Sequence, residues 1–293
     1  MLQLQTYLLL LLTGIMWGGV YLLMAFGLNL IYGVMKVVNL AHGDFIVVAG
    51  LLAVTLYGAF QAGPALAIPL AALLFLVVGL VVYRGLLAHV DTAGPQGELR
   101  TLLITFGLSS IISNIALLIW GGQYQSVPFF QSSVRLGPLF LPESLIVSSL
   151  VAFVLAFAVQ LWLTRTRSGR LVRATAQSEL GAASCGLNTG RIRLLTFALG
   201  AAMAGAAGAL TVVLIPVQAA SGGFVTVQAF TLIALGGLGN YLGALLAAIL
   251  LGVIEVSSSY FLGASAASAL IYLIFILVLI VRPQGLLGQR GRI

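Results

Sequence analysis

The side chains able to carry out acid–base, nucleophilic or metal chemistry are few in this sequence, and they form no recognised catalytic set. The chain has two histidines, His42 and His89, and one cysteine, Cys185. It lacks a GxxxxGK[ST] phosphate loop, an HExxH zinc motif and the paired aspartates of intramembrane prenyl transfer. A single cysteine also excludes a multi-cysteine metal site. We therefore predict a protein that is not an enzyme and holds no metal or cofactor, so that any ATP must be bound by another chain.

Polar side chains gather within stretches that are otherwise apolar. One group lies around residues 29–44, a second flanks a glycine-rich break near 237, and Asn114 lies within a third apolar stretch. Polar groups in hydrocarbon are costly and commonly mark solute pathways. We predict that a translocation pathway is lined by Asn29, Tyr32, Asn39, His42, Asn114, Gln228 and Asn240.

Three residues in the first group also allow structural interpretations. Asn39 or Asp44 could cap the helix that follows by accepting backbone hydrogen bonds. Lys36 must snorkel or pair, and Asp44 is its candidate partner eight residues away. No two acids are spaced like a proton relay, which argues against a proton-coupled carrier.

An arginine-rich segment over 165–193 carries six arginines against one acid, Glu179. Within it, VRATAQSELGAASCGL (172–187) predicts a short amphipathic helix, with Glu179, Gly186 and Asn188 near its C-terminal turn. A solvated loop is the simpler interpretation, but about thirty residues is long for a mere connector. A helix on the surface can dock into a groove of a soluble partner and transmit its motion.

The elements that must position these residues are membrane helices. Of the 293 residues, 61% are apolar and 6% charged, whereas soluble domains are about 45–50% apolar and about 25% charged. A helical span needs about 20 apolar residues. We predict an all-α polytopic membrane bundle of about 8 to 10 segments in a single domain over 1–293, with long helices at 5–27, 42–58, 64–83, 101–120, 144–164, 194–215, 242–258 and 265–281.

Two shorter apolar segments, 28–38 and 227–238, are too short to cross as straight helices unless they are tilted or continued by their neighbours. We predict broken or re-entrant helices there. Glycine permits backbone angles that other residues resist, and the glycines bracketing these breaks are Gly27, Gly33, Gly43, Gly236, Gly237 and Gly239. Each short segment precedes a break and two long helices, over 28–83 and 227–282, a pattern compatible with a parallel internal repeat. The run GAAMAGAAGAL (200–210) has small residues at spacings that allow close helix packing.

The distribution of basic residues predicts orientation, because cytoplasmic loops are rich in Lys and Arg. The 165–193 loop, the 84–100 segment and the C-terminal tail with Arg282, Arg290 and Arg292 are predicted to be cytoplasmic. The first fourteen residues lack the positive region of a cleaved signal and are read as a retained membrane segment. The net charge of +7 is too dispersed for a nucleic-acid partner.

Four motifs, in this order, resemble the LivH-type permease subunits of ATP-binding-cassette (ABC) importers for branched-chain amino acids. They are GLNLIYGVMKVVNLAHGDF (27–45), the coupling-loop region and following helix (168–210), AFTLIALGGLGNYLGALLAAILLGVIE (229–255) and VRPQGLLG (281–288). The resemblance implies a multi-pass protein of the bacterial inner membrane that passes small amino acids into the cytoplasm. It implies four kinds of partner: a second permease of LivM type, two cytoplasmic subunits that bind ATP and Mg, a periplasmic or extracytoplasmic solute-binding protein, and the surrounding lipid.

The resemblance also places a coupling site for the ATPase subunits near 174–188. The predicted contact residues are Arg173, Ala174, Glu179, Ala182, Ala183, Gly186 and Asn188. Leu180 and Gly181 interrupt the Glu-Ala-Ala form of other importers. Some relatives carry amides, urea or small aromatic acids, so these are alternative cargoes. The alternative class of protein is a self-sufficient secondary carrier or channel.

Overall fold

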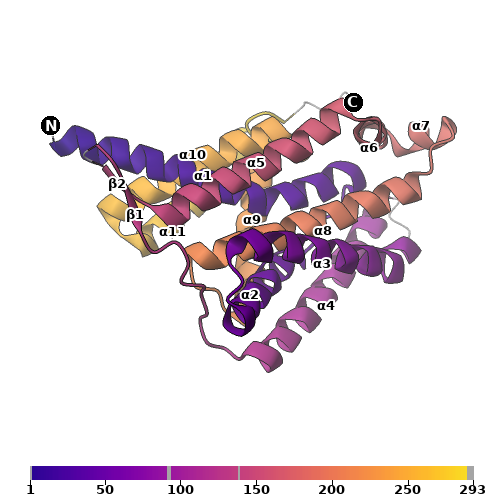
Figure 1. Ribbon diagram of the computed structural model, residues 1–293. Helices are drawn as coiled ribbons and strands as arrows, with labels where there is room; N and C mark the ends of the chain where they lie inside the picture. The colour runs from indigo at the N-terminus through magenta and orange to yellow at the C-terminus, as the bar shows by residue number, and fades with distance from the viewer. Residues whose placement is uncertain (1, 91–93, 138, 289–293) are drawn as a thin grey trace.

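The computed structural model describes residues 2–90, 94–137 and 139–288 as a bundle of helices (Figure 1). The long helices are α1 (Leu2–Met35), α2 (His42–Phe60), α3 (Pro64–Gly85), α4 (Gly94–Trp120), α5 (Glu143–Arg165), α8 (Thr189–Leu214), α9 (Gly222–Gly236), α10 (Tyr241–Leu262) and α11 (Ala264–Val281). Shorter elements are α6 (Arg167–Gln177), α7 (Glu179–Ser184), the 3₁₀ turns Leu87–His89 and Ala219–Ser221, and the antiparallel strands β1 (Ser133–Leu136) and β2 (Leu139–Pro142).

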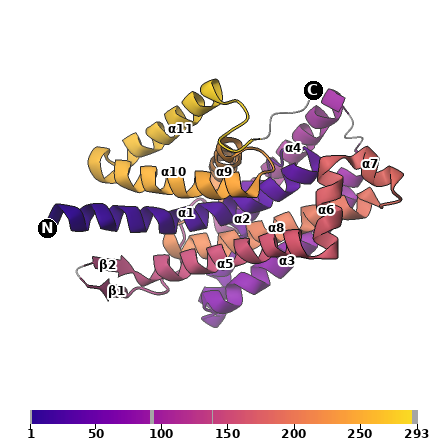
Figure 2. The same cartoon turned by 90° about the horizontal axis from the view of Figure 1, so that it is seen from above.

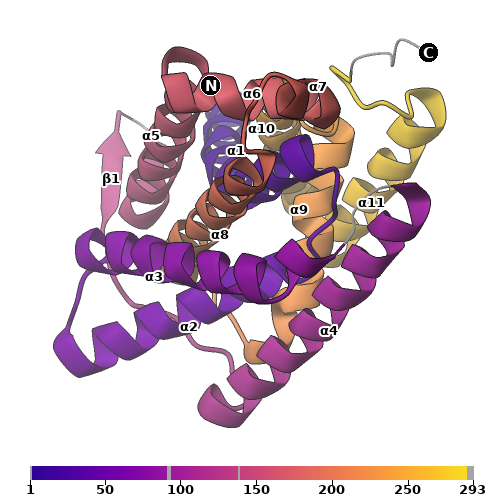
Figure 3. The same ribbon diagram turned by 90° about the vertical axis from the view of Figure 1, so that its right-hand side faces the viewer.

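Within the described ranges, nine helices are long and apolar enough to cross a membrane. The second 3₁₀ turn and α9 together form one of them, 219–236. The predicted all-α polytopic membrane fold is therefore confirmed. Helices α1, α8 and α9 lie towards the inside of the bundle, while α4 and α11 lie at its edge (Figure 3).

The bundle has two distinct ends, seen at the left and right of Figure 2. At the N-terminal end, the Tyr7 ring lies 6.5 Å from the Phe261 ring, and Gln125 pairs with Val217 across two loops. At the other end, here named the coupling-loop end, lie α6 and α7 (Figure 2). The tail also returns there, because Leu286 N–H donates to Leu235 O at 2.8 Å. The predicted tail residues Arg290 and Arg292 fall outside the described residues.

The first short segment, 28–38, is continued by its neighbour. Helix α1 runs unbroken to Met35, so a separate broken helix at 28–38 is wrong, and Gly27 and Gly33 lie inside the helix and break nothing. Their role is packing: a Cβ on Gly27 would collide with the carbonyl oxygen of Gly200 in α8. The break follows this segment, as predicted, in the non-helical stretch 36–41, where Lys36 has a φ of 55°. Gly43 lies in the first turn of α2, just beyond it.

The second predicted break is confirmed at its glycines. Helix α9 ends at Gly236, and Gly237 (φ 105°) and Gly239 (φ 80°) take left-handed angles before α10 begins. The short segment predicted at 227–238 covers the C-terminal part of α9, which starts at Gly222, and the first two residues of the break. Because only this second block begins with a short helix, the pattern that suggested a repeat is lost in the first block. The internal repeat stays a prediction.

Helix α8 forms the centre of the bundle through its small residues. Gly200, Gly205 and Gly208 lie where α1, α3 and α2 respectively approach the α8 backbone. A Cβ on Gly208 would collide with Ile46 O of α2, so the two backbones are in direct contact there. Small residues let membrane helices gain dispersion energy at short range. The close packing predicted for 200–210 is thereby confirmed.

Candidate functional site

The arginine-rich segment is built from helices that begin at side-chain caps. Thr166, Ser178 and Asn188 each accept a hydrogen bond of 3.0 Å from the backbone N–H three residues later. These caps start α6, α7 and α8 respectively, and each satisfies a backbone donor that helix geometry leaves free. The segment therefore has a defined shape at the coupling-loop end.

The single amphipathic helix predicted over 172–187 is wrong, because the chain turns at Ser178. This residue has an extended φ of −157° and caps α7. Serine often ends one helix and caps the next, because its hydroxyl can bond to the backbone in place of a continued helix. Glu179 is consequently the first residue of α7, whereas the sequence placed it near a C-terminal turn. Gly186, with a φ of 79°, follows the end of α7 and supplies the left-handed turn towards α8.

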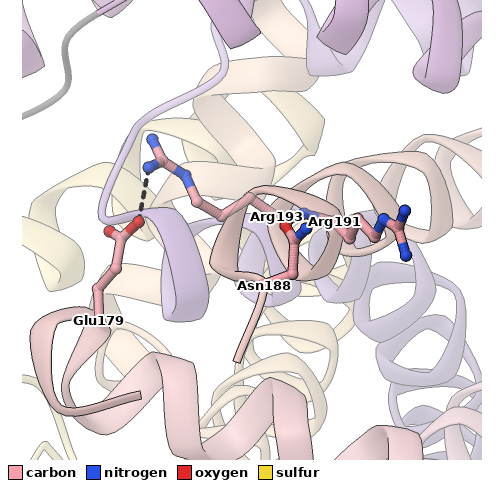
Figure 4. Close-up of polar contacts among 4 residues, drawn as sticks. All are labelled: Glu179, Asn188, Arg191 and Arg193. Atoms are coloured by element: carbon pink, nitrogen blue, oxygen red, sulfur yellow. Dashed lines mark hydrogen bonds and ion pairs between the residues drawn. The ribbon is translucent and has the colours of Figure 1, made fainter. Parts of the chain in front are cut away.

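An ion pair holds α7 against α8 (Figure 4). Arg193 Nη1 donates to Glu179 Oε1 at 2.7 Å, with the arginine side chain 16% exposed and the carboxylate 43% exposed. In the same view Asn188 lies at the start of α8, and Arg191 points away from the pair. A half-exposed pair contributes at most about 1 kcal/mol, so its main effect is to set the position of α7.

Beneath these short helices lies an apolar cluster separate from the main core. It joins α6 to three membrane helices, and its buried members are Leu30, Val34, Leu163, Val172 and Ile192. Because packed side chains transmit displacement, a force applied to α6 reaches α1, α5 and α8 through this cluster.

The predicted coupling residues divide between two faces of this segment. Exposed positions are Arg173, Ala174, Ala183, Gly186 and Asn188. Ala182 is 6% exposed and packs inward. Sequence reasoning missed Leu180, which is 82% exposed on α7, and Arg193 as the partner of Glu179. No local sequence pattern predicts either feature, because each depends on where α7 lies relative to the rest of the bundle.

Two of the predicted pathway asparagines bind the backbone around the second break. Asn29 is fully buried, and its Oδ1 accepts a hydrogen bond of 2.8 Å from Gly239 N–H. Asn240 caps α10 through Gly243 N–H at 3.0 Å, and its Nδ2 donates to Leu287 O at 2.7 Å. Both side chains therefore join α1, α10 and the tail.

Replacing Asn29 with leucine should lower the free energy of unfolding by about 1–3 kcal/mol, because the partly buried Gly239 N–H would lose its acceptor. Denaturation of the purified chain in detergent measures this. Asn114→Leu is the matched control, since Asn114 is exposed on α4 and, among the residues that the structure describes, its side chain bonds only to Ser110 O of its own helix, at 2.7 Å. Equal losses in the two variants would contradict the bridging role.

The first polar group is likewise held inside the protein. Asn39 and His42 are fully buried; Asn39 Oδ1 accepts from Ala41 N–H at 3.1 Å, and His42 Nε2 lies 2.9 Å from Met24 O. Asn39 therefore stabilises the turn before α2, but the alternative that Asn39 or Asp44 caps α2 is wrong, because Ala41 is the N-cap and neither side chain caps this helix. Of the seven predicted pathway residues, Asn114 is exposed, and three are partly exposed: Tyr32, Gln228 and Asn240.

The predicted pairing of Lys36 with Asp44 is wrong. Asp44 is buried and accepts a hydrogen bond of 2.5 Å from Ser109 Oγ in α4. Lys36 is exposed, and its ammonium lies 5.9 Å from the centre of the Tyr32 ring. Partial desolvation lowers the pKa of Lys36. The lysine thus snorkels at the break, while the acid binds α2 to α4.

Comparison with known proteins identifies the family of this chain. The family described as branched-chain amino acid transport system, permease component, matches residues 10–279. The chain belongs to this permease family. Its capped α6–α7 segment and glycine break are thus features of a multi-pass membrane permease.

Individual relatives cover nearly the whole permease. The chain is 30% identical to the high-affinity branched-chain amino acid transport system permease protein LivH of Salmonella typhimurium, over 94% of each chain. It is 27% identical to the corresponding protein BraD of Pseudomonas aeruginosa, over 98% of this chain and 97% of BraD. LivM of Escherichia coli is 28% identical over 92% of this chain and 68% of LivM. No solved structure matches the chain.

Proposed function

We propose that this permease is one membrane subunit of an ABC importer for small amino acids, above all branched-chain ones. The observation that carries the proposal is the α6–α7 segment: two capped helices at one end of the bundle, held to α8 by the Glu179–Arg193 pair and packed on α1, α5 and α8. Such an element suits docking by a soluble motor whose movement must reach membrane helices. The printed names of LivH and BraD support branched-chain amino acids as cargo.

The proposal includes the orientation and the partners. The coupling-loop end faces the cytoplasm of a bacterial inner membrane, because its loop carries six arginines. There two ATPase subunits bind ATP and Mg and act on α6 and α7. A LivM-type permease pairs with this chain, in keeping with its likeness to LivM, and an extracytoplasmic binding protein delivers cargo to the N-terminal end. Amides, urea and small aromatic acids are the alternative cargo within the same class.

Replacing Glu179 and Arg173 together with alanine should lower cargo-stimulated ATP hydrolysis at least about fivefold, because coupling energies between sites are about 1–3 kcal/mol. The change removes the pair to Arg193 and the exposed guanidinium that reaches Thr164 O at 3.4 Å. ATPase assays on the reconstituted complex measure it. A double variant of Glu143 and Arg135 removes the same charges at the N-terminal end and should leave coupling intact. Unchanged coupling in the first variant would remove this assignment.

A self-sufficient carrier is the rival function, and reconstitution separates the two. The purified chain alone in liposomes should accumulate no L-leucine, whereas the complex with its ATPases, second permease and binding protein should accumulate it when ATP is present. Accumulation by the isolated chain without nucleotide would replace the importer proposal with a carrier.

A further inference from the structure

A polar cluster deep in the bundle has no part in the coupling segment. Four helices, α1, α9, α10 and α11, surround a cavity of about 10 Å³ whose polar lining includes Tyr21, Gln228, Glu255 and Tyr272. Tyr21 donates its hydroxyl to Glu255 Oε2 at 2.6 Å. The other carboxylate oxygen receives no hydrogen bond from any residue in the described ranges. The cavity has about the volume that one water-sized group occupies.

The cluster lies well away from both ends of the bundle. Phe261, which contacts Tyr7 at the N-terminal end, is six residues beyond Glu255, a rise of about 9 Å along a helix. Asn29, which contacts the second break, is eight residues beyond Tyr21, or about 12 Å. Glu255 is therefore held at mid-depth, where an acid in contact with lipid is costly.

The carboxylate is nevertheless accessible. Glu255, Gln228 and Tyr272 are each partly exposed, so their face of the bundle must meet water or protein. Asp44, the other acid deep within the described spans, is 2% exposed and bound to Ser109. Glu255 is thus the acid at this depth that can still take a cationic partner.

We propose that Glu255, with Gln228 and Tyr272, binds the ammonium group of the transported amino acid part-way across the membrane. The idea rests on the proposed function. A primary ammonium has three donors and no acceptor, and it meets three acceptors here: the free carboxylate oxygen, the Gln228 carbonyl and the Tyr272 hydroxyl. The cavity admits a group of that size, while the carboxylate and aliphatic side chain of the cargo stay outside it. Tyr21 acts as a positioning residue that orients the acid.

Uptake of L-leucine by the complete importer in proteoliposomes tests whether transport needs the negative charge of Glu255. Glu255→Gln should reduce ATP-dependent uptake at least about tenfold, because a hydrogen bond to a charged group is lost. Glu255→Asp keeps the charge and should recover part of the rate. Glu143→Gln, the matched control, changes an acid at the N-terminal end and should transport normally. Wild-type uptake by Glu255→Gln, or failure of that variant to assemble with the second permease, would overturn the site. No uptake by the wild-type complex would instead refute the proposed function.

A labelling experiment on the unmodified complex tests the ligand group directly. Dicyclohexylcarbodiimide, which reacts with carboxyl groups inside membranes, should label Glu255, and mass spectrometry locates the adduct. L-leucine and 3-methylbutylamine should protect the residue, whereas 4-methylpentanoate, which lacks the ammonium, should not. Absence of labelling, or equal protection by 4-methylpentanoate, would contradict ammonium binding.

Discussion

A Leu180→Glu permease should bind its ATPase subunits about 30-fold more weakly than the wild type, or worse. Leu180 is the large apolar side chain that α7 exposes, at 82%, at the coupling-loop end. An apolar anchor that enters a pocket of the partner commonly contributes about 2 kcal/mol or more to binding, and 1.4 kcal/mol is about tenfold in affinity. A buried glutamate there would also be left unpaired. Binding of purified ATPase subunits to the permease in nanodiscs measures the loss.

Leu238→Glu is the control for this effect. Leu238 lies in the second break at the same end and is 40% exposed, so the same substitution adds the same charge away from α7. It should leave affinity within about threefold, because substitutions outside a binding hot spot have little effect. Equal losses in the two variants would show that charge at this end, and not the α7 anchor, governs assembly.

Gly208→Leu should prevent the stable assembly of the bundle. Any side chain at 208 collides with Ile46 O, and a Cβ there would lie 2.8 Å from Ala49 Cβ and 2.9 Å from Gly50 N. Since the obstruction is mostly helix backbone, α2 and α8 must separate along their contact. Overpacking costs about 1–3 kcal/mol even where side chains can adjust, so we expect a loss of about 3 kcal/mol or more. Thermal unfolding of the purified chain measures it.

Gly107→Leu is the matched substitution in α4. No atom of the described part of the chain lies within 4 Å of a Cβ at position 107, and leucine favours the helix over glycine by roughly 0.5–1 kcal/mol. This variant should unfold at the same temperature as the wild type or slightly above it. A Gly208→Leu protein that melts like Gly107→Leu would show that the α2–α8 contact is looser than the structure has it.

Elements with local causes could be predicted from the amino-acid sequence. A helix crosses a membrane because about 20 successive residues are apolar, and the predicted runs correspond to membrane helices in the structure. The second break was also predictable, because Gly237 and Gly239 supply the left-handed angles it needs. The arginine-rich loop was identified from its composition. In each case the deciding interactions are between a residue and its solvent or its own backbone.

Features that depend on distant parts of the chain could not be predicted in this way and required the three-dimensional fold. Gly27 looked like a helix break, yet contact with α8 makes it a packing position. Asn29 was predicted to line the pathway, yet its side chain accepts a hydrogen bond from Gly239 N–H, 210 residues away in the chain. Glu255 accepts a hydrogen bond from Tyr21, which is 234 residues away in the chain. A glycine or an amide is compatible with several roles, and which role it fills is set by what the fold brings beside it.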